Sequence, residues 1–166
     1  MRLEDAVQQI ESAVGDPRQG LPDTVFRLLT RLTPMMNVDL LIRENGRTLL
    51  TWRDDPDYRG WHVPGGIVRY KERMEDRLVE VARLELGATV AAKSAPIAVN
   101  EIIQVDRSSR GHFISFLFEC SLTAPLDEAR RHRNGPLAHG EWAWHERTPD
   151  EIIVSHDVYR RFIDGG

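Results

Sequence analysis

The 166-residue chain has little of what a disulfide scaffold or a membrane protein needs. Cys120 is its only cysteine, so no disulfide can form within the chain, and its place in an apolar run predicts a buried, unreactive thiol. No apolar stretch approaches the length of a membrane span, and residues 1–14 are acidic and amphipathic, unlike a signal peptide. These absences predict a cytoplasmic protein with no membrane partner.

Positive charge is also scarce. The chain has 22 Lys and Arg residues against 26 Asp and Glu residues, a net charge of −4, and its basic runs are no longer than pairs such as Arg130-Arg131. Duplex-binding proteins need a basic footprint, so we expect no nucleic-acid partner. A G-x-S-x-G turn, a P-loop and a Cys-x-x-Cys pair are all absent from the sequence, which leaves acyl transfer, P-loop hydrolysis and zinc sites without support.

The pattern of hydrophobic residues predicts one domain over residues 1–166. Helical spacing is expected in 3–14, 22–32, 71–86 and 156–163, and extended runs in 37–43, 47–53, 61–63, 97–105, 112–122 and 141–145. Strands, one central helix, more strands and a last helix are typical of an α+β fold or a mixed-sheet sandwich. Residues 1–34 are expected to form an N-terminal helical extension, and residues 37–163 the core.

One carboxylate falls on the apolar face of the central helix. At about 100° per residue, Glu85 lies in the middle of the stripe made by Leu78, Val81 and Ala82. A carboxylate on a buried face is costly unless a cation or several donors meet it. Two interpretations stay open: Glu85 pairs with Arg77 inside the core, or it lines a functional site.

The segment before this helix favours a site. Gly65-Gly66 allows the backbone to come close to a ligand and leaves its carbonyls unhindered. Hard cations such as Mg²⁺ prefer carbonyl and carboxylate oxygens as ligands. A glycine turn that leads into a helix with an inward carboxylate therefore suggests a metal site.

The spacing of Gly66, Glu72 and Glu85-Leu86-Gly87 resembles the Nudix box, here over residues 66–88. Trp61, just before the glycine turn, and Trp144 in the last extended run resemble the flanks of that family. The resemblance implies an α/β/α sandwich with a mixed β-sheet, here with two extra N-terminal helices. It further implies a hydrolase that uses Mg²⁺ or Mn²⁺ to cleave a nucleoside diphosphate linked to another moiety, X.

The box departs from the family pattern. Glu80 stands at its arginine position, and Val81 and Leu84 replace two of its three helical glutamates, so that Glu85 alone remains. The branch with the most similar box is that of the GDP-mannose mannosyl hydrolases, which implies a nucleotide sugar such as GDP-mannose as substrate.

In that branch one Mg²⁺ is held by a glycine carbonyl, the last box glutamate and a glutamine that precedes a catalytic histidine. By position these are Gly65, Glu85 and Ala138, followed by His139. Ala138 has no side-chain ligand to offer. Glu141 is the nearest carboxylate, and we expect it to serve as a metal ligand or as the base.

Two groups near the last strand are therefore candidate catalytic residues, His139 and Glu141. A histidine with a near-neutral pKa suits deprotonation of water. Arg53 and Arg69 are expected to bind the substrate, since guanidinium groups clamp diphosphates. The resemblance to the mannosyl hydrolase branch implies Asp39 as a third substrate-binding residue.

A different class of function also stays open. Loss of two metal ligands is how a catalyst becomes a binding protein, so a Nudix-like module that holds a nucleotide or a protein without hydrolysis is the alternative. The expected partner of the enzyme is a nucleotide-type small molecule. The amphipathic N-terminal helices are expected either to form a homodimer interface or to cover the site.

Overall fold

A computed structural model describes residues 2–165 of the chain. Its strands are β1 (Met35–Glu44), β2 (Arg47–Asp54), β3 (Arg59–His62), β4 (Gly65–Ile67), β5 (Val90–Ala92), β6 (Ala98–Ile103), β7 (His112–Leu122) and β8 (Trp142–His145). Its α-helices are α1 (Leu3–Val14), α2 (Asp23–Leu32), α3 (Met74–Val81) and α4 (Arg160–Ile163). A π-helical segment, η2 (Ala82–Leu86), extends α3, and the 3₁₀ turns are η1 (Pro17–Gln19), η3 (Glu128–Arg130) and η4 (Val154–Tyr159).

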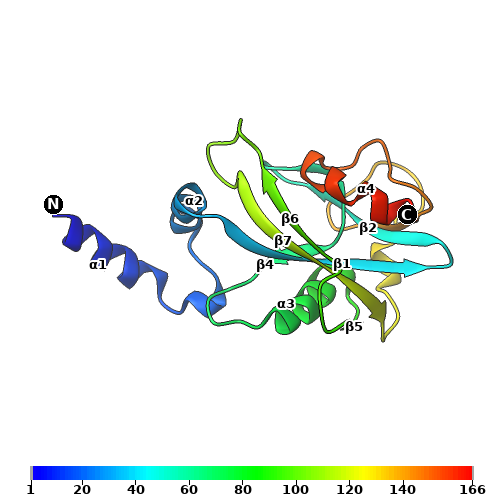
Figure 1. Cartoon of the computed structure of the whole chain (residues 1–166), viewed down its shortest axis with the longest axis horizontal. Coiled ribbons are helices and arrows are strands. Elements are labelled where there is room, and N and C mark those ends of the chain that lie inside the picture. The colour runs from blue at the N-terminus through cyan, green and yellow to red at the C-terminus, as the bar shows by residue number, and fades with distance from the viewer. Residues whose placement is uncertain (1, 166) are drawn as a thin grey trace.

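The described strands form one mixed sheet in the order β3-β2-β1-β7-β5. The central strand β1 runs parallel to β7 and antiparallel to β2 and β4, while β6 pairs with β7 and β8 with β2. α3 covers one face of the sheet and α4 the other (Figure 1). The expected α+β sandwich with a mixed sheet is therefore confirmed.

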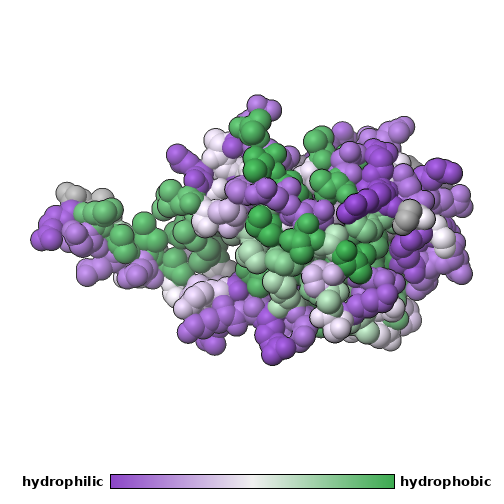
Figure 2. Space-filling model, in the orientation of Figure 1, coloured by the Kyte–Doolittle hydropathy of each residue, from purple (hydrophilic) through white to green (hydrophobic). Residues whose placement is uncertain are grey.

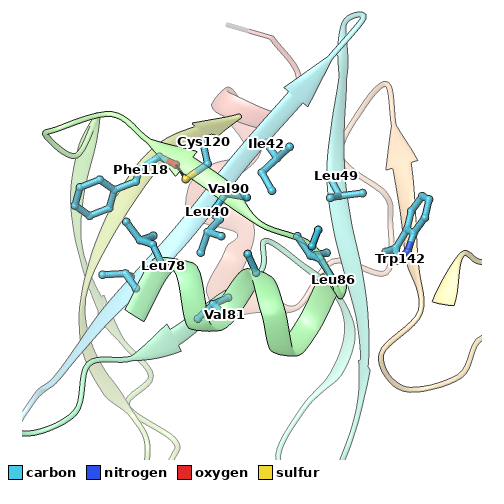
Figure 3. Close-up of a cluster of buried hydrophobic side chains, with 13 residues drawn as sticks. Leu40, Ile42, Leu49, Leu78, Val81, Leu86, Val90, Phe118, Cys120 and Trp142 are labelled. Carbon is cyan, nitrogen blue, oxygen red and sulfur yellow. Dashed lines mark hydrogen bonds between the residues drawn. The ribbon is translucent and has the colours of Figure 1, made fainter. Parts of the chain in front are cut away.

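Alternation along β1 sends its side chains into both layers of the sandwich. Leu40 and Ile42 pack with Leu78 and Leu86 of the α3 side (Figure 3), whereas Leu41 packs with the C-terminal helical segment. β1 is buried on both faces, which explains its continuous apolar run in the sequence. This rigid strand also carries Asp39.

The central helix starts later than expected but ends at the expected residue, with a different geometry in its last turn. The spacing predicted a helix over residues 71–86, but α3 begins at Met74 because Lys71 has a left-handed φ of 57° and Arg73 is extended. Its last turn, η2, is π-helical and ends at Gly87, whose φ is 61°. π-Turns inside helices are frequent at functional sites, and this one carries Glu85.

The N-terminal extension forms two helices, as expected. α1 buries none of its described side chains, and Leu3 remains 77 % exposed. It projects from the body of the molecule (Figure 1), with apolar residues along one side and hydrophilic ones along the other (Figure 2). Over residues 2–165, no helix has the length and apolar character required to cross a membrane.

Candidate functional site

A cavity of about 650 Å³ opens beside the glycine turn of β4. It brings together six of the seven residues expected at the site. Those that line it are Asp39, Arg53, Gly65, Arg69, Glu85 and His139. They come from β1, β2, β4, the loop after β4, η2 and the loop before β8, so the sheet and the central helix together position them.

Glu85 points into the cavity from the π-helical turn. Its Oε2 accepts a hydrogen bond of 3.0 Å from the Thr51 hydroxyl of β2 and lies 3.8 Å from Nε2 of His62. Burial raises the pKa of Glu85 to about 7, against the lowering effect of the Thr51 hydrogen bond and of the Arg53 charge. A carboxyl group with this pKa is poised to lose its proton to a cation or a base near neutral pH.

The alternative pairing of Glu85 with Arg77 is wrong. Arg77, which is 4 % exposed, donates instead to both carboxylate oxygens of Glu72, at 2.7 and 2.9 Å. The same carboxylate accepts a 2.8 Å hydrogen bond from the backbone N–H of Arg69. Glu72 thus fastens the loop after β4 to α3, and its oxygens are already occupied by donors.

Asp39 lies deep in the cavity and is 1 % exposed. Its Oδ2 accepts hydrogen bonds from the Ser115 hydroxyl and, at 2.6 Å, from the Tyr159 hydroxyl, whereas its Oδ1 has no partner. Burial raises the pKa of Asp39 to about 6, although both hydroxyl donors act to lower it. The carboxylate occupies the space that a side chain at Gly65 would need, so a glycine is required there.

Arginines form the cationic wall of the cavity. The Arg53 guanidinium pairs with Asp55 and lies 5.1 Å from the centre of the Tyr58 ring. Arg110, also 5.1 Å from that ring, donates to Asp57 at 2.9 Å. Arg110 belongs to the β6–β7 loop, and sequence reasoning missed it because the sequence places that loop far from the glycine turn.

His139 lies at the mouth of the cavity and is held by the chain of β2. Its Nδ1 accepts a 3.1 Å hydrogen bond from the backbone N–H of Asp54. A ring nitrogen that accepts such a bond carries no proton, so the neutral imidazole has its proton on Nε2. In this state His139 is a hydrogen-bond donor toward the cavity.

Glu141 is the expected site residue that does not line the cavity. Its Oε2 accepts a 3.0 Å hydrogen bond from the backbone N–H of Ala138 and lies 2.9 Å from Nδ1 of His132. The Ala138 hydrogen bond lowers the pKa of Glu141. This carboxylate closes the turn before β8, and the structure does not bring it to Glu85.

The metal-ligand atoms that the cavity offers fit only a loosely held metal ion. Among residues 2–165, no three His, Cys, Asp or Glu side chains are grouped as metal ligands. Val81 is buried in the core and Leu84 is exposed to solvent, at the two positions where the box has glutamates. Mg²⁺ often keeps several waters and binds one or two carboxylates together with substrate phosphates. Glu85 and the Gly65 backbone suit this mode of binding.

Comparisons with known proteins agree with this architecture. No family model matches the chain. The low-salt glycan biosynthesis protein Agl8 of Haloferax volcanii is 33 % identical over 110 residues, which cover 64 % of this chain and 70 % of that protein. An ADP-ribose pyrophosphatase of Methanocaldococcus jannaschii is 32 % identical over 88 residues, 52 % of this chain and 50 % of that enzyme.

Solved structures share the fold at low sequence identity. A MutT Nudix hydrolase from Burkholderia pseudomallei superposes with a TM-score of 0.60 at 20 % identity, over 76 % of this chain and 95 % of that one. An ADP-ribose pyrophosphatase from Streptococcus suis superposes with a TM-score of 0.54 at 16 % identity, over 75 % of this chain and 84 % of that one.

Proposed function

The chain has the Nudix fold and belongs to one family with the Agl8 protein of Haloferax volcanii, and on this premise we propose that it is a Mg²⁺-dependent hydrolase of nucleoside diphosphates linked to a second moiety X. The observation that carries the proposal is the cavity in which Glu85, Arg53, Arg69 and His139 meet. A carboxylate for a divalent cation and donors for a diphosphate then face the same space.

A nucleotide sugar, for example GDP-mannose, is the substrate class that we favour. One relative is named for glycan biosynthesis and another for hydrolysis of ADP-ribose, in which X is also a sugar.

The residues of this chain would bind and orient the diphosphate. Arg53 and Arg69 supply guanidinium donors, which match phosphate oxygens in pairs. His139, with its proton on Nε2, donates a hydrogen bond that would stabilise negative charge on the leaving oxygen. We propose this donor role for His139 in place of the base expected from the sequence; Glu141, outside the cavity, positions the loop that carries it.

Glu85 is the residue that would hold the ion, through Oε1, since Oε2 is engaged by Thr51. Mg²⁺, or Mn²⁺ in its place, would neutralise the diphosphate charge and lower the pKa of an attacking water. Displacement of the Glu85 proton by the cation accompanies binding, because burial keeps that pKa near neutral.

The test is turnover of a panel of nucleotide sugars, ADP-ribose, dinucleotide polyphosphates and nucleoside triphosphates with Mg²⁺, with products resolved by ³¹P NMR. We expect Glu85→Gln to lose activity by about 100-fold or more, since the metal contributes several kcal/mol. Glu80→Gln is the matched control, because Glu80 pairs with Arg83 away from the cavity. Full activity of Glu85→Gln would refute the metal assignment.

A second candidate is a Nudix-like module that binds a nucleotide without hydrolysis. The apolar residues Val81 and Leu84 at two ligand positions favour it. Tight nucleotide binding by calorimetry, with no turnover across the panel, would select this function over the first. The homodimer and the cytoplasmic location stay predictions, and sedimentation velocity tests the former.

A further inference from the structure

We infer that α2 of the N-terminal extension forms the nucleobase-binding wall of the cavity, and this inference rests on the proposed nucleoside diphosphate substrate. The cavity has two chemically different ends. Arginines surround the end near the glycine turn, whereas α2 borders an apolar end with Phe26 and Leu29. The N-terminal extension, residues 1–34, therefore contributes to the site itself, although the sequence indicates only that it is additional to the core.

The floor of the apolar end is built by three neighbouring strands. Met35 of β1 and Ile102 of β6 are both register partners of Phe113 in β7. Residues that are register partners on neighbouring strands present their side chains on the same face of a sheet. All three line the cavity together with Phe26 and Leu29. The result is a continuous apolar surface with two aromatic rings.

Polar contacts fasten the extension to the cationic end. Arg27 of α2 pairs with Asp57 at 3.3 Å, and Arg69 donates to the backbone carbonyl of Arg18 at 3.1 Å. The Arg110 guanidinium lies 5.5 Å from the centre of the Phe26 ring. Two arginines that line the cavity thus contact the extension directly. These contacts place α2 beside the diphosphate-binding groups.

A nucleobase is the part of the substrate that fits this end. It is planar and stacks on aromatic rings, with a loss of about 1–3 kcal/mol per base when such a ring is replaced by alanine. The moiety X, if it is a sugar, has hydroxyls that an apolar wall would leave without partners.

The experiment compares binding of GDP, ADP, UDP and CDP with binding of methyl diphosphate, which has no base, by titration calorimetry with Mg²⁺. Phe26→Ala and Leu29→Gln are the test variants. Leu32→Ala is the control, since Leu32 lies on the same helix, is 71 % exposed and does not line the cavity. Thermal unfolding followed by circular dichroism verifies that each variant is folded, and Leu29→Gln tests the wall should Phe26→Ala not fold.

We expect the wild type to bind at least one nucleoside diphosphate more tightly than methyl diphosphate. Phe26→Ala should weaken the binding of that nucleotide by about 5- to 150-fold, the stacking loss converted to affinity. Its binding of methyl diphosphate should not change, and neither should nucleotide binding by the Leu32→Ala control. Equal affinity of the wild type for nucleotide and methyl diphosphate overturns the inference, as does an equal loss for both ligands in Phe26→Ala. Base-dependent binding without turnover refutes only the hydrolase activity, and the assignment of α2 stands.

Discussion

Asp39→Asn should make the folded protein more stable near pH 8. The Asp39 carboxylate is 1 % exposed, and its Oδ1 has no hydrogen-bond partner. Burial raises its pKa from 3.8 to about 6, so above pH 6 the folded protein holds a charge that it solvates poorly. An asparagine carries no charge, and its amide oxygen can accept the hydrogen bonds that Ser115 and Tyr159 now donate to Oδ2.

The magnitude follows from the shift in pKa. The folded state binds the Asp39 proton more tightly than the unfolded state, so the contribution of this group to the free energy of unfolding falls as the pH rises from 3.8 to about 6. A shift of about two units at 1.36 kcal/mol each gives a loss of about 3 kcal/mol, which is complete above the folded pKa. Asp39→Asn should therefore gain about 2–3 kcal/mol over the wild type at pH 8 and little at pH 4.

The assay is urea unfolding followed by tryptophan fluorescence at both pH values. Asp106→Asn is the control, because Asp106 is exposed and its replacement should change stability equally little at both. If Asp39→Asn were less stable than the wild type at pH 8, or if its effect were the same at pH 4, the attribution of the pKa shift to burial would be refuted.

Two further predictions concern the core. Arg77→Ala should lower the free energy of unfolding by about 3 kcal/mol, because Glu72 loses both hydrogen bonds from a buried guanidinium. Arg73→Ala is the control, since Arg73 is exposed and its replacement should cost far less. Equal urea midpoints of the two variants would contradict this prediction. The Cys120 thiol, whose pKa burial raises to about 12, should resist a thiol reagent at pH 8 until urea unfolds the chain. Rapid labelling of the native protein would be the contrary result.

Local patterns in the sequence were sufficient to predict most of the helices and strands. The hydrophobic spacing of residues 3–14 and 112–122 predicts α1 and β7 with their observed bounds. The strands β4 and β5 were not predicted, because segments of three residues carry no periodicity of their own and are extended only through pairing. The late start of α3 at Met74 reflects local side-chain contacts that hydrophobic spacing does not reveal, since Glu72 binds Arg77 and the backbone of Arg69 instead of continuing the helix.

The candidate site was likewise predictable from the sequence only in part. Helical periodicity alone places Glu85 on the inner face, and the cavity confirms that position. The sequence could not show that Glu141 bonds to His132 and Ala138 rather than facing the cavity, because a strand pattern gives the side of a residue but not its partners. Nor could it show that Arg110, from a distant hairpin, joins the cationic wall.

The sequence by itself determined the α+β class and the inward position of Glu85, since both follow from local periodicity, whereas the mixed sheet was implied by the resemblance to the Nudix box. Only the tertiary structure showed that Phe26 of the extension and Arg110 of the β6–β7 loop join Glu85 at the cavity. These residues are far apart in the chain and share no local pattern. Their proximity results from the packing of whole elements, and so does the burial that shifts the pKa of Asp39 and of Glu85.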